Sequence, residues 1–216
     1  MNVAIDGPAG AGKSTIAKLC AKKMGLIYVD TGAMYRAVAL YLLESGVNVE
    51  STDIVADKCT GAKVDIRYVD GVQNIFLGDE NVTGRLREEA VGNAASVVSA
   101  VPKVREHLFT LQRGLVERGG IIMDGRDIGT VVMPDADVKI FLTASSEVRA
   151  ARRVKELEEK GEHPDFETVK KEIEERYHRD MTREISPLKQ AEDAILVDTS
   201  DMTIDEVVEK IISLCR

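Results

Sequence analysis

Cysteine is scarce in this sequence of 216 residues, and its spacing carries no motif. Cys20, Cys59 and Cys215 are odd in number, lie far apart and include no C-x-x-C pair. The sequence therefore indicates neither a disulfide framework nor a zinc site. We expect all three to be reduced thiols in the core.

The chain also lacks a surplus of positive charge and any long hydrophobic run. Lys and Arg number 29 against 37 Asp and Glu, which gives a formal net charge of -8. That balance argues against a nucleic acid or an anionic membrane as the main partner, because both require a basic surface. Met1 leads directly into a short apolar run at residues 3–5, without a basic segment and a long hydrophobic stretch, so we expect a cytoplasmic protein. Any phosphate-binding site must therefore be a small local group of cations in a chain that is acidic as a whole.

Tracts of low complexity are absent as well, and 44% apolar with 31% charged residues is the composition of an ordinary globular protein. Short apolar runs are spaced between longer amphipathic stretches, a pattern that predicts an α/β fold with helices covering a parallel sheet. The runs are apolar throughout, as expected of strands buried on both faces. The predicted strands are residues 2–6, 26–29, 121–124, 138–142 and 195–197.

Residues 63–77 break this pattern. Val64, Ile66 and Tyr68 alternate with other residues, and an extended run resumes after Asp70-Gly71. Asp-Gly between two extended runs predicts a β-hairpin. We therefore divide the chain into a core of residues 1–60 and 85–216 and an antiparallel insert of residues 61–84. The pattern leaves open whether the insert is a decorative flap or part of an acceptor site.

The strongest local motif is Gly7-Pro8-Ala9-Gly10-Ala11-Gly12-Lys13-Ser14, a full match to the phosphate loop G-x-x-x-x-G-K-[ST]. It follows the first predicted strand and begins a helix with an apolar stripe of Ile16, Leu19, Cys20 and Met24. Backbone amides and the helix N-terminus can then converge on phosphate oxygens. Lys13 supplies a cation to the β- and γ-phosphates of ATP, and Ser14 can ligate Mg²⁺. The predicted ATP-binding residues are Gly7, Pro8, Ala9, Gly10, Ala11, Gly12, Lys13, Ser14 and Thr15.

The last helix has the clearest helical pattern. Thr203 and Glu206 have the spacing of a capping box, and the apolar residues that follow fall on one face. We expect that face to lie against the sheet. Its residues are Ile204, Val207, Val208, Ile211, Ile212 and Cys215.

A phosphate loop alone is compatible with a kinase, a hydrolysing motor or a regulatory switch. The residues that would bind a phosphoryl acceptor must therefore distinguish these functions. Arg36 and Arg126 each follow a predicted strand closely, where parallel sheets present ligand-binding groups. They are placed to clamp an acceptor phosphate and to neutralise charge during transfer. Arginines also recur on two helical faces, and for Arg152 and Arg179 we favour a solvated charge. These two faces comprise Arg149, Arg152 and Arg153, and Arg176, Arg179, Asp180 and Arg183.

Five further segments carry a resemblance that covers essentially the whole chain. They are DTGAMYR at 30–36, NAAS at 93–96, PKVRE at 102–106, DGRDIGTVV at 124–132 and RYHRD at 176–180. With the phosphate loop, they make the sequence similar to the bacterial cytidylate kinases of the nucleoside monophosphate kinase family. The antiparallel insert is also typical of these kinases.

The resemblance implies a P-loop three-layer α/β/α fold with a five-stranded parallel sheet, the antiparallel insert and a mobile helical lid at about residues 149–183. It implies ATP-dependent phosphorylation of CMP, and of dCMP, by direct in-line transfer. ATP would be used with Mg²⁺, and we expect a monomer that acts on small molecules.

The resemblance also assigns individual residues. Arg36, Arg126 and Arg183 match positions that hold the acceptor phosphate, and Arg176 and Asp180 match positions near the ribose. Lys13, Arg126 and Arg183 are the implied catalytic set. Thr31 stands where some members have serine, so the hydroxyl is retained. The positions around the cytosine ring are Ser96, Arg105 and Asp127.

This last set is chemically reasonable, because cytosine presents an N4 donor beside the N3 and O2 acceptors, which suits a carboxylate and a guanidinium. A kinase for another small acceptor, such as UMP, thymidylate or shikimate, would keep the loop without this set. A pure ATP-binding module would lack the acceptor-side arginines. A GTPase-type switch would need an Asn-Lys-x-Asp segment, which the sequence does not contain.

Overall fold

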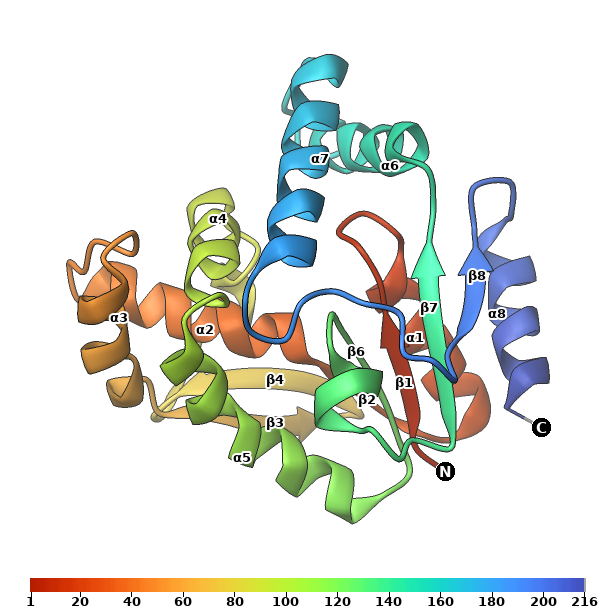
Figure 1. Ribbon diagram of the computed structural model, residues 1–216, viewed down its shortest axis with the longest axis horizontal. Coiled ribbons are helices and arrows are strands. Elements are labelled where there is room, and N and C mark those ends of the chain that lie inside the picture. The colour runs from red at the N-terminus through yellow and green to blue at the C-terminus, as the bar shows by residue number, and fades with distance from the viewer. Residues whose placement is uncertain (216) are drawn as a thin grey trace. The chain divides into compact units, whose positions relative to one another are not determined.

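A computed structural model of the chain describes residues 1–215 (Figure 1). The chain divides into two compact units, which are described separately. The first unit consists of Met1–Leu26 with Gly120–Arg216, and the second of Ile27–Gly119. No helix within residues 1–215 is long and apolar enough to cross a membrane.

The described residues contain a five-stranded parallel sheet in the order β2-β6-β1-β7-β8. Its strands are β1 (Val3–Asp6), β2 (Ile27–Asp30), β6 (Ile121–Gly125), β7 (Val138–Thr143) and β8 (Ile195–Asp198). In β1 and β6 every residue is buried, as the unbroken apolar runs predicted. All five predicted strands are confirmed, with ends that differ by at most one residue.

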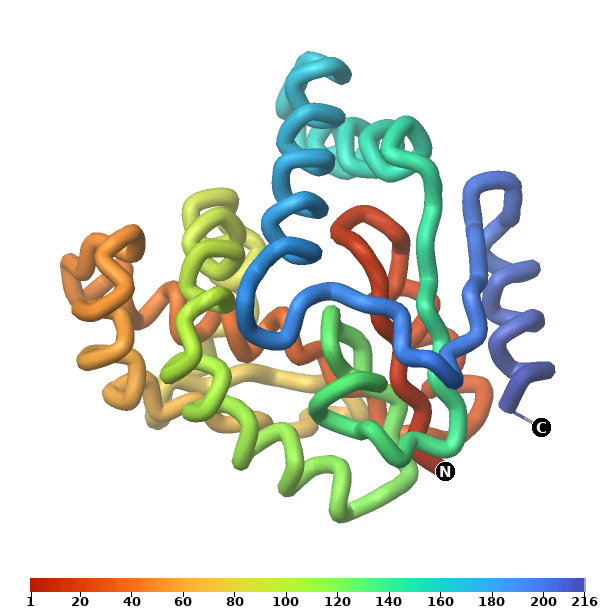
Figure 2. The backbone as a smooth tube through the Cα atoms, in the orientation of Figure 1, coloured from red at the N-terminus to blue at the C-terminus, as the bar shows by residue number. Residues whose placement is uncertain are grey.

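The helices of the first unit are α1 (Lys13–Met24), α6 (Ser146–Glu158), α7 (Phe166–Thr182) and α8 (Ile204–Leu214). One π-helical turn, η3 (Ile128–Val132), follows β6. Figure 2 follows the backbone from β7 into α6, along α7 and through a long connection to β8. Helices α6 and α7 share a small apolar cluster of Ala150, Leu157, Val169 and Ile173.

Two predicted apolar faces need correction. Leu19 of α1 is 36% exposed, and the helix instead buries the small residues Ala17 and Ala21 beside Ile16 and Cys20. The short side chains of alanine let α1 approach its neighbours closely. In α8 the capping box of Thr203 and Glu206 is confirmed, but Ile204, in the first turn, is 54% exposed.

The second unit contains α2 (Thr31–Glu44), α3 (Thr52–Lys58), α4 (Glu89–Val98) and α5 (Pro102–Arg118). Two short 3₁₀ turns, η1 (Cys59–Gly61) and η2 (Thr83–Arg85), join these elements to a small antiparallel sheet. The three cysteines Cys20, Cys59 and Cys215 of the whole chain are free and buried, as predicted.

The small sheet is the predicted hairpin with one additional short strand. Strands β3 (Val64–Val69) and β4 (Val72–Leu77) pair antiparallel, and β5 (Glu80–Asn81) pairs with β4. The turn residues Asp70 and Gly71 have φ of 50° and 75°. Two positive φ values are what a two-residue hairpin turn that matches the strand twist requires.

The insert does not have a core of its own. Ile75 and Val82 lie in one buried cluster with Ala37 and Leu40 of α2 and with Val91 of α4. Val64, Ile66 and Leu77 pack against the same cluster. One apolar face of the hairpin therefore packs against α2.

We predict that Ile75→Ala lowers the free energy of unfolding by about 2–5 kcal/mol, because it opens a cavity in the cluster shared with α2. Val72 begins the same strand but is 62% exposed, so Val72→Ala should change it by less than about 0.5 kcal/mol. Urea unfolding of both variants measures the difference. Equal small effects would show that the insert is an independent flap.

Candidate active site

The phosphate loop connects β1 to α1, and its glycines are required by close contacts. A Cβ atom on Gly7 would lie 1.9 Å from the carbonyl oxygen of Leu142 in β7. A Cβ atom on Gly10 would lie 3.0 Å from Cβ of Arg149, and both glycines have positive φ. Gly12 at the N-cap has no side chain, so the first amides of α1 are left to bind an anion.

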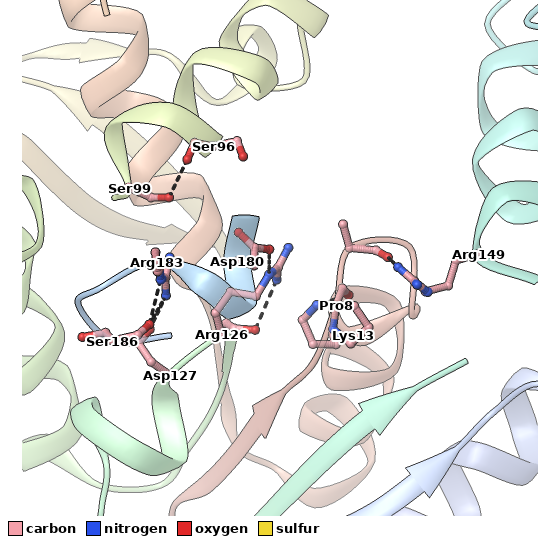
Figure 3. Close-up of polar contacts among 12 residues, drawn as sticks. Pro8, Lys13, Ser96, Ser99, Arg126, Asp127, Arg149, Asp180, Arg183 and Ser186 are labelled. Carbon is pink, nitrogen blue, oxygen red and sulfur yellow. Dashed lines mark hydrogen bonds and ion pairs between the residues drawn. The ribbon is translucent and has the colours of Figure 1, made fainter. Parts of the chain in front are cut away.

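Lys13, the first residue of α1, has a buried side chain at the end of this loop. Its Nζ donates a hydrogen bond to the carbonyl oxygen of Pro8 at 2.8 Å (Figure 3). Burial, and next the positive charge of Arg126, hold the pKa of Lys13 well below its usual value. A bound anion would favour the charged form. The side chain is therefore suited to a phosphate group rather than to a permanent protein partner.

Ser14 and Asp124 place two oxygen ligands next to the loop. The Ser14 hydroxyl donates to Asp124 Oδ2 at 3.0 Å, and Asp124 is buried near the end of β6. Hydroxyl and carboxylate oxygens are the ligands that Mg²⁺ prefers. Sequence reasoning named Ser14 and missed Asp124. The signal that could have found it is an aspartate directly after the buried run Ile121 to Met123.

Two arginines of α6 hold the backbone of the phosphate loop. The Arg149 guanidinium donates to the carbonyl oxygens of Ala9 at 3.2 Å and Ala144 at 3.1 Å. Arg152 donates to Ala11 at 3.3 Å and also bonds Thr199. The prediction that Arg152 is a solvated helix charge is wrong, because loop carbonyl groups satisfy its donors.

The first unit brings four predicted acceptor-side residues together in two ion pairs (Figure 3). Arg126 Nε donates to Asp180 Oδ2 at 2.8 Å, and Arg183 Nη2 lies 3.9 Å from Asp127 Oδ1. Arg183 also donates through Nε to the carbonyl oxygen of Ser186 at 2.7 Å. All four charged side chains have little exposed area. Their guanidinium groups are thus held in place before any ligand binds.

Asp180 is ionised in spite of its burial. Burial raises the pKa of its carboxyl group, but Arg126, with weaker contributions from Arg176 and Arg183, more than offsets this, so the pKa lies below the usual value. The predicted ribose residues Arg176 and Asp180 both belong to α7. They interact electrostatically, because the positive charge of Arg176 lowers the pKa of Asp180.

Asp6, at the end of β1, organises the turn that follows the acceptor arginine. Its two carboxylate oxygens accept the backbone N–H groups of Ile128 at 2.8 Å and Gly129 at 2.7 Å. Burial raises the pKa of Asp6 to about 7, and the two amides act in the opposite direction. The sequence motif gave no role to Asp6.

In the second unit, Thr31 and Arg36 lie in the first two turns of α2. Asp30 caps this helix by accepting the N–H of Ala33 at 3.0 Å. A Cβ atom on Gly32 would lie 3.2 Å from Asp30 Oδ1 and 3.6 Å from Arg36 Nη1. The glycine therefore allows the carboxylate and the guanidinium to approach the same place.

Two predicted base-binding residues of this unit belong to α4 and α5. The Ser96 hydroxyl is buried and has no hydrogen-bond partner among residues 1–215. Arg105 donates to the carbonyl oxygen of Ser99 at 3.1 Å, and its guanidinium carbon lies 5.3 Å from the ring centre of Tyr35. Figure 3 shows Ser96 of α4 next to Ser99, the C-cap residue of that helix, whose hydroxyl donates to the Ser96 carbonyl oxygen at 3.0 Å. A buried hydroxyl without a partner is suited to a polar ligand.

Comparison with known proteins places these features in a family. A family model described as "Cytidylate kinase" matches residues 3–216. Cytidylate kinases from Listeria innocua and Caldicellulosiruptor saccharolyticus are 54% and 49% identical, over 99% of this chain and 95% of each relative. The cytidylate kinase of Enterococcus faecalis is 47% identical over 98% of this chain and 93% of that protein.

Solved structures with low identity share the fold. An uncharacterised protein from Eubacterium ventriosum aligns with a TM-score of 0.52 at 13% identity, covering 99% of this chain and 96% of that one. A gluconokinase from Sinorhizobium meliloti aligns with a TM-score of 0.51 at 12% identity, covering 98% and 89%. A shikimate kinase from Bacteroides thetaiotaomicron aligns with a TM-score of 0.50 at 14% identity, covering 100% and 98%.

The raised pKa of Asp6 gives a pH prediction. The folded protein holds a proton there that the unfolded chain releases between about pH 4 and pH 7. The free energy of unfolding of the parent should therefore fall, relative to that of Asp6→Asn, as the pH rises through this window. Urea unfolding at several pH values measures the difference. A relative rise would show that the two amides outweigh burial.

Proposed function

We propose that this chain, which belongs to the cytidylate kinase family, transfers the γ-phosphoryl group of ATP directly to CMP. The observation that carries the proposal is the convergence of two cations. Figure 3 shows Arg126, an acceptor-side residue, near Lys13 of the phosphate loop, and the positive charge of Arg126 lowers the pKa of Lys13. Donor and acceptor cations close together are suited to phosphoryl transfer, in which charge must be stabilised on both reacting groups.

On the donor side, we assign ATP to the loop. The backbone N–H groups of Gly7, of residues 9–12 and of Thr15, in the first turn of α1, would bind the phosphate oxygens, whereas Pro8 has no N–H to donate. Lys13 would release Pro8 and bind the transferring group. Ser14 and Asp124 fit Mg²⁺, because both offer oxygen ligands at the loop. When bound, Mg²⁺ neutralises charge on the ATP phosphates.

On the acceptor side, we assign the CMP phosphate to Arg36, Arg126 and Arg183, with the Thr31 hydroxyl as a further contact. One guanidinium group can donate two parallel hydrogen bonds to two phosphate oxygens, and it stays charged at all physiological pH values. Asp180 orients Arg126 through their 2.8 Å hydrogen bond. Asp180 and Arg176 are then available to the ribose hydroxyl groups of CMP, and a deoxyribose acceptor, dCMP, would lose one of those contacts.

For the base, we assign cytosine to Ser96, Arg105 and Asp127. Asp127 is an acceptor for the N4 amino group, while Arg105 is a donor to N3 or O2. Uracil reverses the first two of these groups, so it would leave buried polar atoms unpaired. The relatives above are named cytidylate kinases, and nothing in the chain favours UMP instead.

The chemical step needs no covalent enzyme intermediate. The acceptor phosphate oxygen attacks the γ-phosphorus as the bond to the leaving ADP breaks, and Lys13, Arg126 and Arg183 stabilise the charge on the transferring group. We assign residues 149–183 as a lid that excludes water. We assign the insert, residues 61–84, to the acceptor side.

We further propose that the protein acts as a cytoplasmic monomer on free nucleotides. Its net charge of -8 disfavours polyanionic surfaces, so the cations are concentrated where substrate phosphates bind.

Lys13→Ala should lower kcat for CMP phosphorylation by about 100-fold or more, because it removes a charge that stabilises the transferring group. Lys13→Met should behave alike. The matched control is Lys22→Ala, which changes an exposed lysine in the last turn of the same helix and should leave kcat within about twofold. Near-normal kcat in either Lys13 variant would contradict the assigned transfer site.

Asp127→Asn should reduce kcat/KM for CMP and narrow its advantage over UMP, because the new amide can donate to uracil O4. The measurement is the ratio of kcat/KM for the two acceptors, which cancels any general effect on Arg183. Asp135→Asn, an exposed aspartate nearby in the sequence, is the control. An unchanged ratio in Asp127→Asn would remove this residue from the base site.

A further inference from the structure

The insert makes polar contacts with one short piece of backbone, the end of β2. The side-chain amide of Gln73 in β4 accepts the N–H of Asp30 at 2.8 Å through Oε1 and donates to the Asp30 carbonyl oxygen at 3.2 Å through Nε2. The Tyr68 hydroxyl in β3 donates to the Tyr28 carbonyl oxygen at 3.1 Å. Gln73 and Tyr68 are direct partners across the hairpin, so they extend from the same face.

These side-chain hydrogen bonds take the place of the backbone hydrogen bonds that a further strand next to β2 would make. β2 is the outermost strand of its sheet, and alternate residues of a strand direct their backbone groups to the same edge. Tyr28 and Asp30 are two residues apart, and their outward groups are the ones that Gln73 and Tyr68 bind. A single glutamine that bonds both the N–H and the C=O of one residue holds the two peptide groups on either side of that residue in position and orientation.

Asp30 is also where α2 begins. Its side chain caps the helix at Ala33, Thr31 is the first helical residue, and Arg36 lies in the second turn of the same helix. A shift of the Asp30 peptide would therefore displace Thr31 and Arg36 together. Ile75, two residues beyond Gln73 on the same face of β4, packs against Ala37 and Leu40 farther along α2.

We infer that Gln73 is a positioning residue for CMP: the insert fixes the start of α2, and thereby Thr31 and Arg36, through the paired hydrogen bonds to Asp30. The inference rests on the proposed function, which assigns these two residues to the acceptor phosphate. It gives the insert a role other than a decorative flap. We assign no substrate contact to Gln73, and the two residues that it positions belong to the acceptor phosphate, so its effect must appear in acceptor binding and not in ATP binding.

The test compares Gln73→Met with Asn74→Met. Asn74 is the next residue of β4, faces the opposite side, and bonds Asn81 and the Val72 carbonyl oxygen instead of β2. Gln73→Met should raise KM for CMP about tenfold, while KM for ATP stays within about twofold. Asn74→Met should change neither. Tyr68→Phe removes one bond, should raise KM for CMP by a smaller factor, and replaces Gln73→Met if that variant does not fold.

Hydrogen exchange of the amides of residues 31–36 gives a second readout that does not depend on the acceptor. Exchange should be faster in Gln73→Met than in the parent, and unchanged in Asn74→Met. An unchanged KM for CMP in both Gln73→Met and Tyr68→Phe, or an equal rise in KM for ATP, would overturn the inference. A parent that does not phosphorylate CMP would contradict the proposed function, and the exchange result would still decide the role of Gln73.

Discussion

Buried positive charge is the constraint on which the first unit depends. A cation removed from water must be paired or hydrogen-bonded, because otherwise its desolvation costs several kcal/mol. Arg126 and Arg183 form ion pairs with buried aspartates, and Arg149 donates hydrogen bonds to backbone carbonyl groups. Lys13 has one carbonyl group and a depressed pKa. The incomplete compensation of Lys13 is what a bound phosphate would relieve, so the same burial that limits stability prepares the site for its substrate.

Aspartates at strand ends direct the surrounding structure. Asp6 ends β1 and holds the turn after Arg126, Asp30 ends β2 and caps α2, and Asp124, the fourth residue of β6, accepts the Ser14 hydroxyl. Asp198 ends β8 and accepts the N–H of Ser200. Parallel strands end with open backbone and side-chain groups at one edge, and a carboxylate there can orient either a turn or a ligand. The phosphate loop and the acceptor residues depend on these short contacts.

Contiguous patterns were predictable, whereas long-range contacts were not. The order of strand, loop and helix around the phosphate-loop motif, the other strands and the Asp70-Gly71 turn each lie in one short segment, and the structure confirms them. Arg152 and Gln73 bind backbone groups far along the chain, so their residue type alone says nothing of their partners. The buried face of α1 carries Ala17 and Ala21 rather than Leu19, a choice that periodicity cannot resolve. The phosphate-loop roles follow from the motif, whereas the roles at the ribose and the base follow only from the family resemblance, because those residues are scattered along the chain.

The most direct test of the central claim is the turnover of the unaltered protein with ATP, Mg²⁺ and each of CMP, dCMP, UMP and AMP in a coupled assay for ADP. We predict that kcat/KM is higher for CMP than for UMP or AMP, and that CDP forms in equal amount to ADP. A preference for UMP or AMP would contradict the assignment of Ser96, Arg105 and Asp127 to cytosine. ADP release without any phosphorylated acceptor would contradict the kinase itself.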